Sequence, residues 1–169
     1  YAEVRTAQLG LDGLAVGIGT TLLFHCDMVF ATPTARFQTP FLDLGLVPEA
    51  GSSLLMPQRL GYARAFEMLV LGAPMDAQTM ASAGLVNAIV AGDALEEHVM
   101  GVASALARKP PAALAHARRL LRGDVDAVAR RTDEEAAIFA QQLKSAEARE
   151  AFQAFMEKRP ADFSKLRGS

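Results

Sequence analysis

The chain has a single cysteine, little net charge and no long hydrophobic run, and each of these absences excludes a class of protein. One thiol, Cys26, rules out a disulfide scaffold and favours a reducing compartment, so we expect a cytoplasmic protein. The 17 basic and 19 acidic residues give a net charge of −2, without the basic excess typical of nucleic-acid-binding proteins. No apolar run approaches the roughly 18 residues of a membrane span, and residues 1–10 lack the apolar core of a signal peptide. Neither nucleic acid nor a membrane is therefore an expected partner.

The composition that remains is that of a folded domain. With 169 residues, 51% of them hydrophobic, the chain has the length of about one domain and is too apolar for a disordered tail. Residues 1–49 are rich in Gly, Thr and apolar runs, and residues 50–92 alternate between helix-like and strand-like segments. Residues 93–169 read as helix after helix. This order indicates an α/β core over residues 1–92 followed by a helical region over residues 93–169.

Glycines, prolines and polar caps mark the ends of the expected elements. The elements are a strand at 85–90 and helices at 63–71, from Ala77 to Gly84, from a capping box at Asp93 and Glu96 to about Arg108, from Pro111 to Gly123, and from Ser145 to Pro160. The last helices carry broad apolar faces, which must be buried on the chain's own core or on a neighbouring subunit. These faces include Ile138, Phe139, Leu143, Phe152, Phe155 and Met156.

The first segment that points to chemistry is the glycine-rich run 13–24, which leads into an apolar helix. Such a turn lets backbone N–H groups at the helix start point at an incoming oxygen. Gly17 and Gly19 resemble part of the dinucleotide fingerprint, but Leu22 stands where its third glycine is needed, which rejects a Rossmann site. The alternative is a tight turn that packs a helix on a sheet, and the segment alone leaves both interpretations open.

The second segment, 35–53, is largely apolar but contains Glu49 between Pro48 and Ala50, where a helix is expected to begin. A carboxylate at a helix start is an ordinary cap. The same group in an apolar pocket is a candidate general base. Taken by itself, the segment does not decide between these two interpretations.

Together the two segments resemble the crotonase (enoyl-CoA hydratase/isomerase) superfamily over about residues 11–169. The stretches that match in order and spacing are 13–19, 26–27, 37–41, 44–53, 83–86 and 154–159. The resemblance implies a core spiral of stacked ββα turns followed by a helical trimerisation region. It also implies an acyl-CoA thioester substrate, no metal or redox cofactor, and a homotrimer or hexamer.

The resemblance assigns Ile18 as one of two backbone N–H donors to the enolate oxyanion. Glu49 matches the glutamate of the Δ3,Δ2-enoyl-CoA isomerase branch, together with the flanking Pro48, Ser52 and Ser53. The two carboxylates of a hydratase are replaced by Thr21 and Phe41, neither of which suits syn hydration. We therefore expect an isomerase in which Glu49 removes a C2 proton and returns a proton to C4. The alternatives are a hydratase in which Glu49 alone handles water, and a non-catalytic acyl-CoA-binding relative.

Further roles follow from the same resemblance. The implied substrate pocket comprises Ala15, Val16, Gly17, Thr21, Phe41 and Leu46. Phe155 and Lys158 match residues that hold the CoA nucleotide, although Lys158 also fits a solvated terminal lysine.

Several other polar residues are expected to serve the structure alone. His25 and Cys26 do not suit a nucleophile pair, because adjacent helix positions point in different directions. Asp27 and Asp43 are expected to be structural. A run of arginines mixed with acids is expected to form a solvated face, and consists of Arg118, Arg119, Arg122, Arg130 and Arg131.

Family members have a substantial segment before the glycine turn, which carries early strands and the second oxyanion donor. Only twelve residues precede Gly13, and Tyr1 to Gln8 reads as a polar helix end. A truncated gene product, a shortened chain and a piece of a longer protein all remain open.

Overall fold

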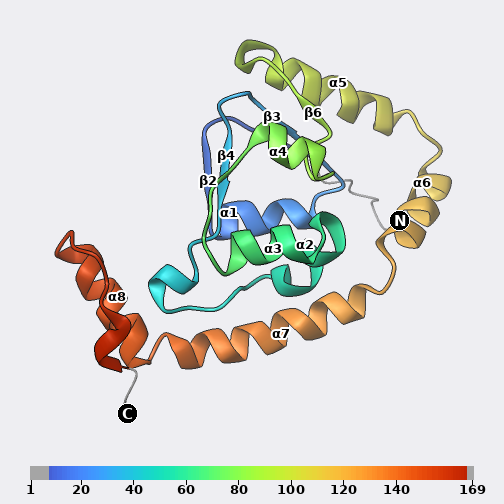
Figure 1. Ribbon diagram of the computed structural model, residues 1–169. Helices are drawn as coiled ribbons and strands as arrows, with labels where there is room; N and C mark the ends of the chain where they lie inside the picture. Colours follow the sequence, from blue (N-terminus) through green and yellow to red (C-terminus); the bar gives the residue numbers. More distant parts are fainter. Residues whose placement is uncertain (1–7, 167–169) are drawn as a thin grey trace.

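The computed structural model describes residues 8–166, in which short strands and helices are followed by four consecutive longer helices (Figure 1). The strands are β1 (Gln8–Leu11), β2 (Leu14–Val16), β3 (Met28–Ala31), β4 (Arg36–Gln38), β5 (Met75–Asp76) and β6 (Ala88–Ile89). The α-helices are α1 (Ile18–Thr21), α2 (Ser52–Leu60), α3 (Tyr62–Leu69), α4 (Ala77–Ser82), α5 (Leu95–Ala107), α6 (Pro111–Arg122), α7 (Val125–Gln142) and α8 (Ala146–Met156). Gln8 opens a strand rather than ending a helix, and the rest of the expected helix end lies outside the described residues.

The strands form two three-stranded sheets, ordered β1-β3-β6 and β2-β4-β5. β1 pairs in parallel with β3, from Gln8 opposite Met28 to Leu11 opposite Ala31, and β2 pairs in parallel with β4. The first two passes of the chain each add one strand to each sheet and then a helical segment. In the third pass α4 lies between the two strands, since β5 pairs antiparallel with β4 before α4 and β6 pairs in parallel with β3 after it. This arrangement confirms the expected stacking of ββα turns, and the crossover helices allow the parallel pairing.

Apolar side chains from the strands and from α2 to α4 meet in a single core. Phe37 of β4 and Val29 of β3 are completely buried, as are Met56, Met68 and Met80 of the three helices. In α3 the buried residues are Ala65, Met68 and Leu69, at the spacing of one helix face. The core thus holds the inner sheet faces against the helices that follow them.

Helices α5 to α8 form an arc around this core (Figure 1). α5 packs on β1, since a side chain at Gly10 would come within 3.1 Å of Val99. α8 contacts the core closely at Gly45, where a side chain would come within 2.7 Å of the Ala148 backbone nitrogen. The expected apolar faces are divided: Phe139 packs against the core, whereas Phe155 and Met156 are exposed.

Several expected boundaries are confirmed. Pro111 occupies the first position of α6, Gly123 follows its last residue, and the Ser145 side chain caps α8 by accepting the Ala148 N–H at 3.0 Å. α8 ends at Met156 rather than at Pro160, with Lys158 in the left-handed region just beyond (φ 54°).

Two expectations about helix and strand ends are wrong. The predicted capping box at Asp93 does not form, because Asp93 lies in a 3-10 helix (Gly92–Ala94) and α5 starts after Ala94. The strand expected at 85–90 shrinks to β6, since the N–H groups of Leu85 and Val86 both bond to the Met80 carbonyl and so belong to the turn after α4.

The expected solvated face of arginines is only partly correct. Arg118 and Arg122 instead hold α6 against the core through Asp27, with N–O distances of 2.8 and 2.9 Å. Arg122 also donates to the His25 carbonyl. Arg119 is exposed, Arg130 pairs with Asp124 just before α7, and Arg131 pairs with Glu134 of α7.

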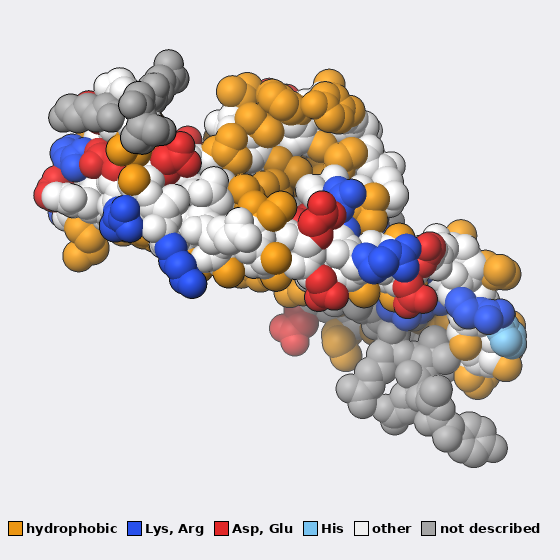
Figure 2. Space-filling model, turned by 90° about the horizontal axis from the view of Figure 1, so that it is seen from below, with side chains coloured by type: hydrophobic (Ala, Val, Ile, Leu, Met, Phe, Trp, Pro, Cys, Tyr) orange, Lys and Arg blue, Asp and Glu red, His pale blue; other side chains and the backbone are white. Residues whose placement is uncertain are grey.

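Seen from the side of α7, basic and acidic side chains lie intermixed toward both ends, and hydrophobic side chains gather over the core (Figure 2). Among residues 8–166, no helix combines the length and the apolar character needed to cross a bilayer.

Candidate active site

A glycine bend between β2 and α1 opens the site. Gly17, at φ 55° and ψ −119°, is the N-cap of α1, and its N–H bonds to the Gln38 carbonyl at 2.9 Å. The Gly17 carbonyl accepts the N–H groups of Thr20 and Thr21, which closes the first turn. Ile18 is the first helical residue, where a helix supplies no internal acceptor for the N–H. The bend therefore places the Ile18 amide at the start of the helix.

The half-buried Glu49 faces this glycine-led helix. Its Oε1 accepts a 2.6 Å hydrogen bond from Thr21 Oγ1, and Thr21 is completely buried on α1, three residues beyond Ile18. Glu49 does not form the first turn of α2, which begins at Ser52. A carboxylate whose one oxygen is held by a buried hydroxyl retains a second oxygen for an incoming proton.

Glu49 belongs to a tight turn, residues 49–53, which we call the Glu49 turn. Ala50 and Gly51 both have left-handed backbones, with φ of 57° and 70°, which delays the start of α2 to Ser52. His25 Nε2 lies 2.6 Å from the Ala50 carbonyl oxygen. Because a carbonyl only accepts, Nε2 carries the proton in this contact. His25 therefore supports the turn, whereas Cys26 Sγ is directed at the Leu22 carbonyl.

The other side of the Glu49 turn is held by Glu135 of α7. Its two carboxylate oxygens accept the N–H groups of Gly51 (2.6 Å) and Ser53 (2.9 Å), and the residue is buried. The sequence carries no local signal for this contact, because 84 residues separate Gly51 from Glu135. His25 was visible in the sequence, but only as a neighbour of Cys26.

The other expected pocket residues divide between the bend and the core. Gly17 lies at the bend, and Val16 just before it is exposed. The three remaining residues, Ala15, Phe41 and Leu46, belong to the buried core cluster. The Leu46 N–H bonds to the Phe41 carbonyl at 2.8 Å, which fixes the loop leading to Glu49.

The expected CoA-binding pair lies at the end of α8. Phe155 is in the last turn of α8 and is largely exposed, and Lys158 follows the end of that helix. No backbone hydrogen bond within residues 8–166 joins either of them to the Glu49 turn.

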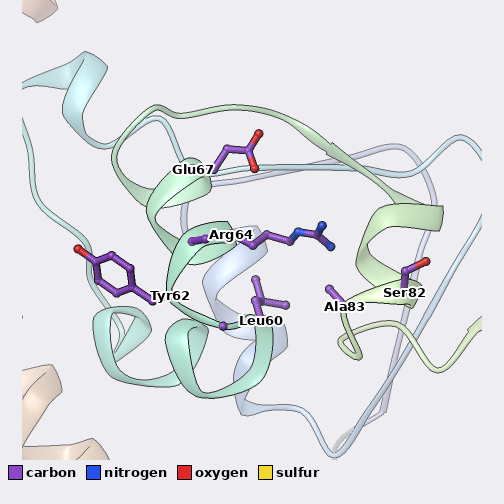
Figure 3. A pocket seen from close by; sticks show the side chains of 8 residues that line it. Leu60, Tyr62, Arg64, Glu67, Ser82 and Ala83 are labelled. Atoms are coloured by element: carbon purple, nitrogen blue, oxygen red, sulfur yellow. The ribbon is translucent and has the colours of Figure 1, made fainter.

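Two cavities lie elsewhere on the molecule. One, of about 580 Å³, lies between α2, α3 and α4, where the Arg64 side chain points toward Ser82 and Ala83 (Figure 3). The other, of about 480 Å³, lies between α2 and α6. Neither is lined by Glu49 or Ile18, and the described part of the chain contains no group of three His, Cys, Asp or Glu residues that could hold a metal ion.

Comparison with known proteins relates this geometry to a family. The profile of the enoyl-CoA hydratase/isomerase family matches residues 10–166. The chain is 32% identical to the 2,3-dehydroadipyl-CoA hydratase of Escherichia coli K12, covering 90% of this chain and 60% of that protein. It is 38% identical to enoyl-CoA delta isomerase 2 of Rattus norvegicus, covering 66% of this chain and 29% of that protein.

Solved structures give the same result for the fold. A crystal structure of an enoyl-CoA hydratase/isomerase from Pseudoalteromonas atlantica is 42% identical with a TM-score of 0.89, covering 91% of this chain and 62% of that one. The chain thus spans about 60% of the length of the first relatives it matches. Hydratases and isomerases both occur among the relatives, so the likeness does not favour one branch. The crotonase-like α/β fold and the profile match together show that the chain belongs to the enoyl-CoA hydratase/isomerase family.

Proposed function

We propose that the protein carrying this chain is an enoyl-CoA isomerase with Glu49 as its only base. Glu49 removes a proton from C2 of a 3-enoyl-CoA, and the C2–H electron pair moves into a dienolate whose charge rests on the thioester oxygen. The protonated Glu49 then returns the proton to C4, which leaves a C2=C3 double bond and restores the carboxylate. The observation that carries the proposal is the 2.6 Å contact that directs Glu49 toward the glycine-led helix.

The oxyanion is assigned to the Ile18 N–H at the start of α1. A donor that is already oriented toward the developing charge contributes about 3–4 kcal/mol to lowering the barrier. A second donor is implied by the family resemblance, and we assign it to no residue among 8–166. No metal or redox cofactor is needed for this proton transfer.

The hydratase alternative is supported by the likeness to the E. coli 2,3-dehydroadipyl-CoA hydratase. Against it stands the environment of Glu49, which has no second carboxylate at the two positions that the family resemblance marks. Thr21 bonds to Glu49 itself, and Phe41 is a buried apolar residue that cannot move a proton. A single base is sufficient for a double-bond shift but leaves hydration without its second proton carrier.

Two substrates separate these functions. Incubation with a 3-enoyl-CoA is expected to give the 2-enoyl-CoA, and incubation with a 2-enoyl-CoA in water is expected to give no 3-hydroxyacyl-CoA. Hydration without isomerisation would reject the isomerase in favour of the hydratase.

The third possibility, a non-catalytic acyl-CoA-binding relative, is tested by Glu49→Gln. This change removes the base and keeps the shape of the side chain, so turnover is expected to disappear while acyl-CoA binding stays nearly unchanged. Surviving activity in the variant would reject the role of Glu49.

The remaining assignments belong to the same proposal. Phe155 and Lys158 contact the CoA nucleotide, and the helical region 93–169 joins subunits into a homotrimer or hexamer. The surface of α8 carries exposed apolar side chains, which include Phe152, Phe155 and Met156. An exposed apolar surface of this kind is typical of a contact with another subunit.

A further inference from the structure

We propose that Glu135 of α7 is a positioning residue for the reaction, because it holds the Glu49 turn in the geometry that directs the Glu49 carboxylate. The inference rests on the proposed function, because its kinetic test measures the isomerisation of a 3-enoyl-CoA. Glu135 does not touch the reacting atoms. It acts through the backbone that carries the base.

The contact is bidentate and buried. Oε2 of Glu135 accepts the Gly51 N–H at 2.6 Å and Oε1 accepts the Ser53 N–H at 2.9 Å. Only 5% of the Glu135 surface is exposed. A buried carboxylate needs hydrogen-bond donors, and the two amides satisfy it from a single turn of backbone.

The Glu49 turn needs an external partner of this kind. Gly51 is the N-cap of α2 and has no side chain to accept the free N–H groups of the first helical turn. Glu135 supplies that cap from a distant helix, and its negative charge lies at the favourable end of the α2 dipole. Ala50 adds a left-handed backbone that L side chains rarely adopt, so surrounding contacts must hold it in place.

Packing fixes the distance between α7 and the turn. A side chain at Gly51 would come within 3.1 Å of Thr132 Oγ1 and 3.2 Å of Val128 Cγ1. Arg131 Nη1 also donates to Ser53 Oγ at 3.1 Å. These residues and Glu135 recur at helical spacing along one face of α7, so the helix presents a continuous surface to the turn.

The link from Glu135 to the base is short. Gly51 is two residues from Glu49, and the Ser52 N–H bonds back to the Glu49 carbonyl at 3.1 Å. A shift of the backbone at Gly51 would therefore displace Glu49 relative to Thr21. A displacement of about 1 Å at a reacting group can lower the rate about 100-fold.

The test compares Glu135→Gln with Asp133→Asn in the full protein. Glu135→Gln keeps the shape of the side chain but turns an NH2 group toward one of the two backbone donors. Asp133 is an exposed acid on the same helix, so Asp133→Asn controls for the lost charge. We measure kcat and KM for a 3-enoyl-CoA, the number of acyl-CoA sites per chain, and amide hydrogen exchange at Gly51 and Ser53.

We expect Glu135→Gln to lower kcat about 10- to 100-fold, with KM and the number of acyl-CoA sites nearly unchanged. Exchange at the two amides should accelerate, and Asp133→Asn should match the wild type in every measurement. A merely structural role would instead reduce the number of sites in parallel with kcat, which would overturn the proposal. Unchanged kcat and unchanged exchange would also overturn it.

Two further comparisons keep the test decisive. If Glu135→Gln does not fold, Glu135→Asp keeps the charge, shortens the reach and is expected to show the same selective loss of kcat. A wild-type protein that fails to isomerise 3-enoyl-CoA rejects the proposed function alone, because faster amide exchange in Glu135→Gln still reports whether Glu135 anchors the turn.

Discussion

At the scale of single residues, the site depends on how a few side chains fix one carboxylate. The family resemblance singled out Glu49 and Ile18, and the structure places Glu49 against the helix that Ile18 opens. Thr21 was expected as a pocket residue that stands where a hydratase has a carboxylate, and in the structure its hydroxyl holds Glu49. Sequence patterns predict which residue types occur near a turn, whereas hydrogen bonds between segments 28 residues apart depend on how those segments pack.

Removal of the Thr21 hydroxyl tests its hold on Glu49. Thr21→Val keeps the volume of the buried side chain and removes the donor, so we expect kcat for a 3-enoyl-CoA to fall about 10-fold, in line with the roughly 1.5 kcal/mol of one hydrogen bond to a charged group. Thr21→Ser retains a hydroxyl and is expected to stay within about threefold of the wild-type rate. Equal rates for Thr21→Val and the wild type would show that Glu49 is positioned without this contact.

The alkylation rate of Cys26 tests whether its thiol is buried in the folded protein. Burial raises the pKa of the Cys26 thiol, and the neighbouring Asp27 carboxylate adds to the rise. Because the thiolate is the reactive form, alkylation by iodoacetamide at pH 8.5 should be at least about 10-fold slower in the folded protein than in the unfolded chain. Similar rates in both states would mean that the Cys26 thiol is open to solvent in the folded protein.

At the scale of helices and strands, end signals were reliable where a side chain or proline acts locally. Ser145 and Pro111 mark the starts of α8 and α6 as expected. The same reasoning failed at Asp93, because a 3-10 helix takes up the residues that the capping box would use. It also failed at the start of α2, whose cap comes from α7. Local patterns do not encode a cap supplied by another helix.

The contacts of Glu150 at the end of α8 predict that the protein loses stability in acid. Hydrogen bonds from the Arg159 side chain and then from the Asp162 backbone N–H lower the pKa of Glu150 from its ordinary value of 4.5 to about 2. A carboxyl group with a lowered pKa in the folded state stabilises the fold above about pH 4.5, and this contribution is lost as the pH falls toward 2. Between these two pH values, the free energy of unfolding should therefore fall less in Glu150→Gln than in the wild type.

Denaturant unfolding at a series of pH values measures this effect. Glu147→Gln is the matched control, because Glu147 is an exposed glutamate on the same helix. The same pH dependence in Glu150→Gln and in the wild type would contradict the assigned role of the Arg159 contact.

At the scale of the whole molecule, the helical arc is attached to the core at separate points. Asp27 binds α6, Glu135 binds α7 to the Glu49 turn, and Gly45 receives α8. The order of an α/β core and a helical region was predictable from the alternation of apolar segments. The attachment of α6 was not, because Arg118 and Arg122 resemble solvated arginines until Asp27 is brought beside them.

The attachment of α6 predicts a difference between two arginines. Arg122 bonds to Asp27 and to the His25 carbonyl and is mostly buried, whereas the Arg130 pair with Asp124 is largely exposed. Arg122→Met should lower the free energy of unfolding by about 1–3 kcal/mol, since it removes one of the two arginines that bind the half-buried Asp27 carboxylate and the donor to the His25 carbonyl. Arg130→Met should change it by no more than about 0.5 kcal/mol. Equal effects in denaturant unfolding would show that α6 is not held by this pair.

The most direct measurement follows the C2 proton itself. A 3-enoyl-CoA carrying deuterium at C2 is incubated with the wild type and with Glu49→Gln. The rate of conversion is measured, and mass spectrometry locates the deuterium in the product. We predict that the wild type converts the labelled substrate more slowly than the unlabelled one, that deuterium appears at C4 of the product, and that Glu49→Gln converts neither. Conversion by Glu49→Gln at the wild-type rate would contradict the assignment of Glu49 as the base.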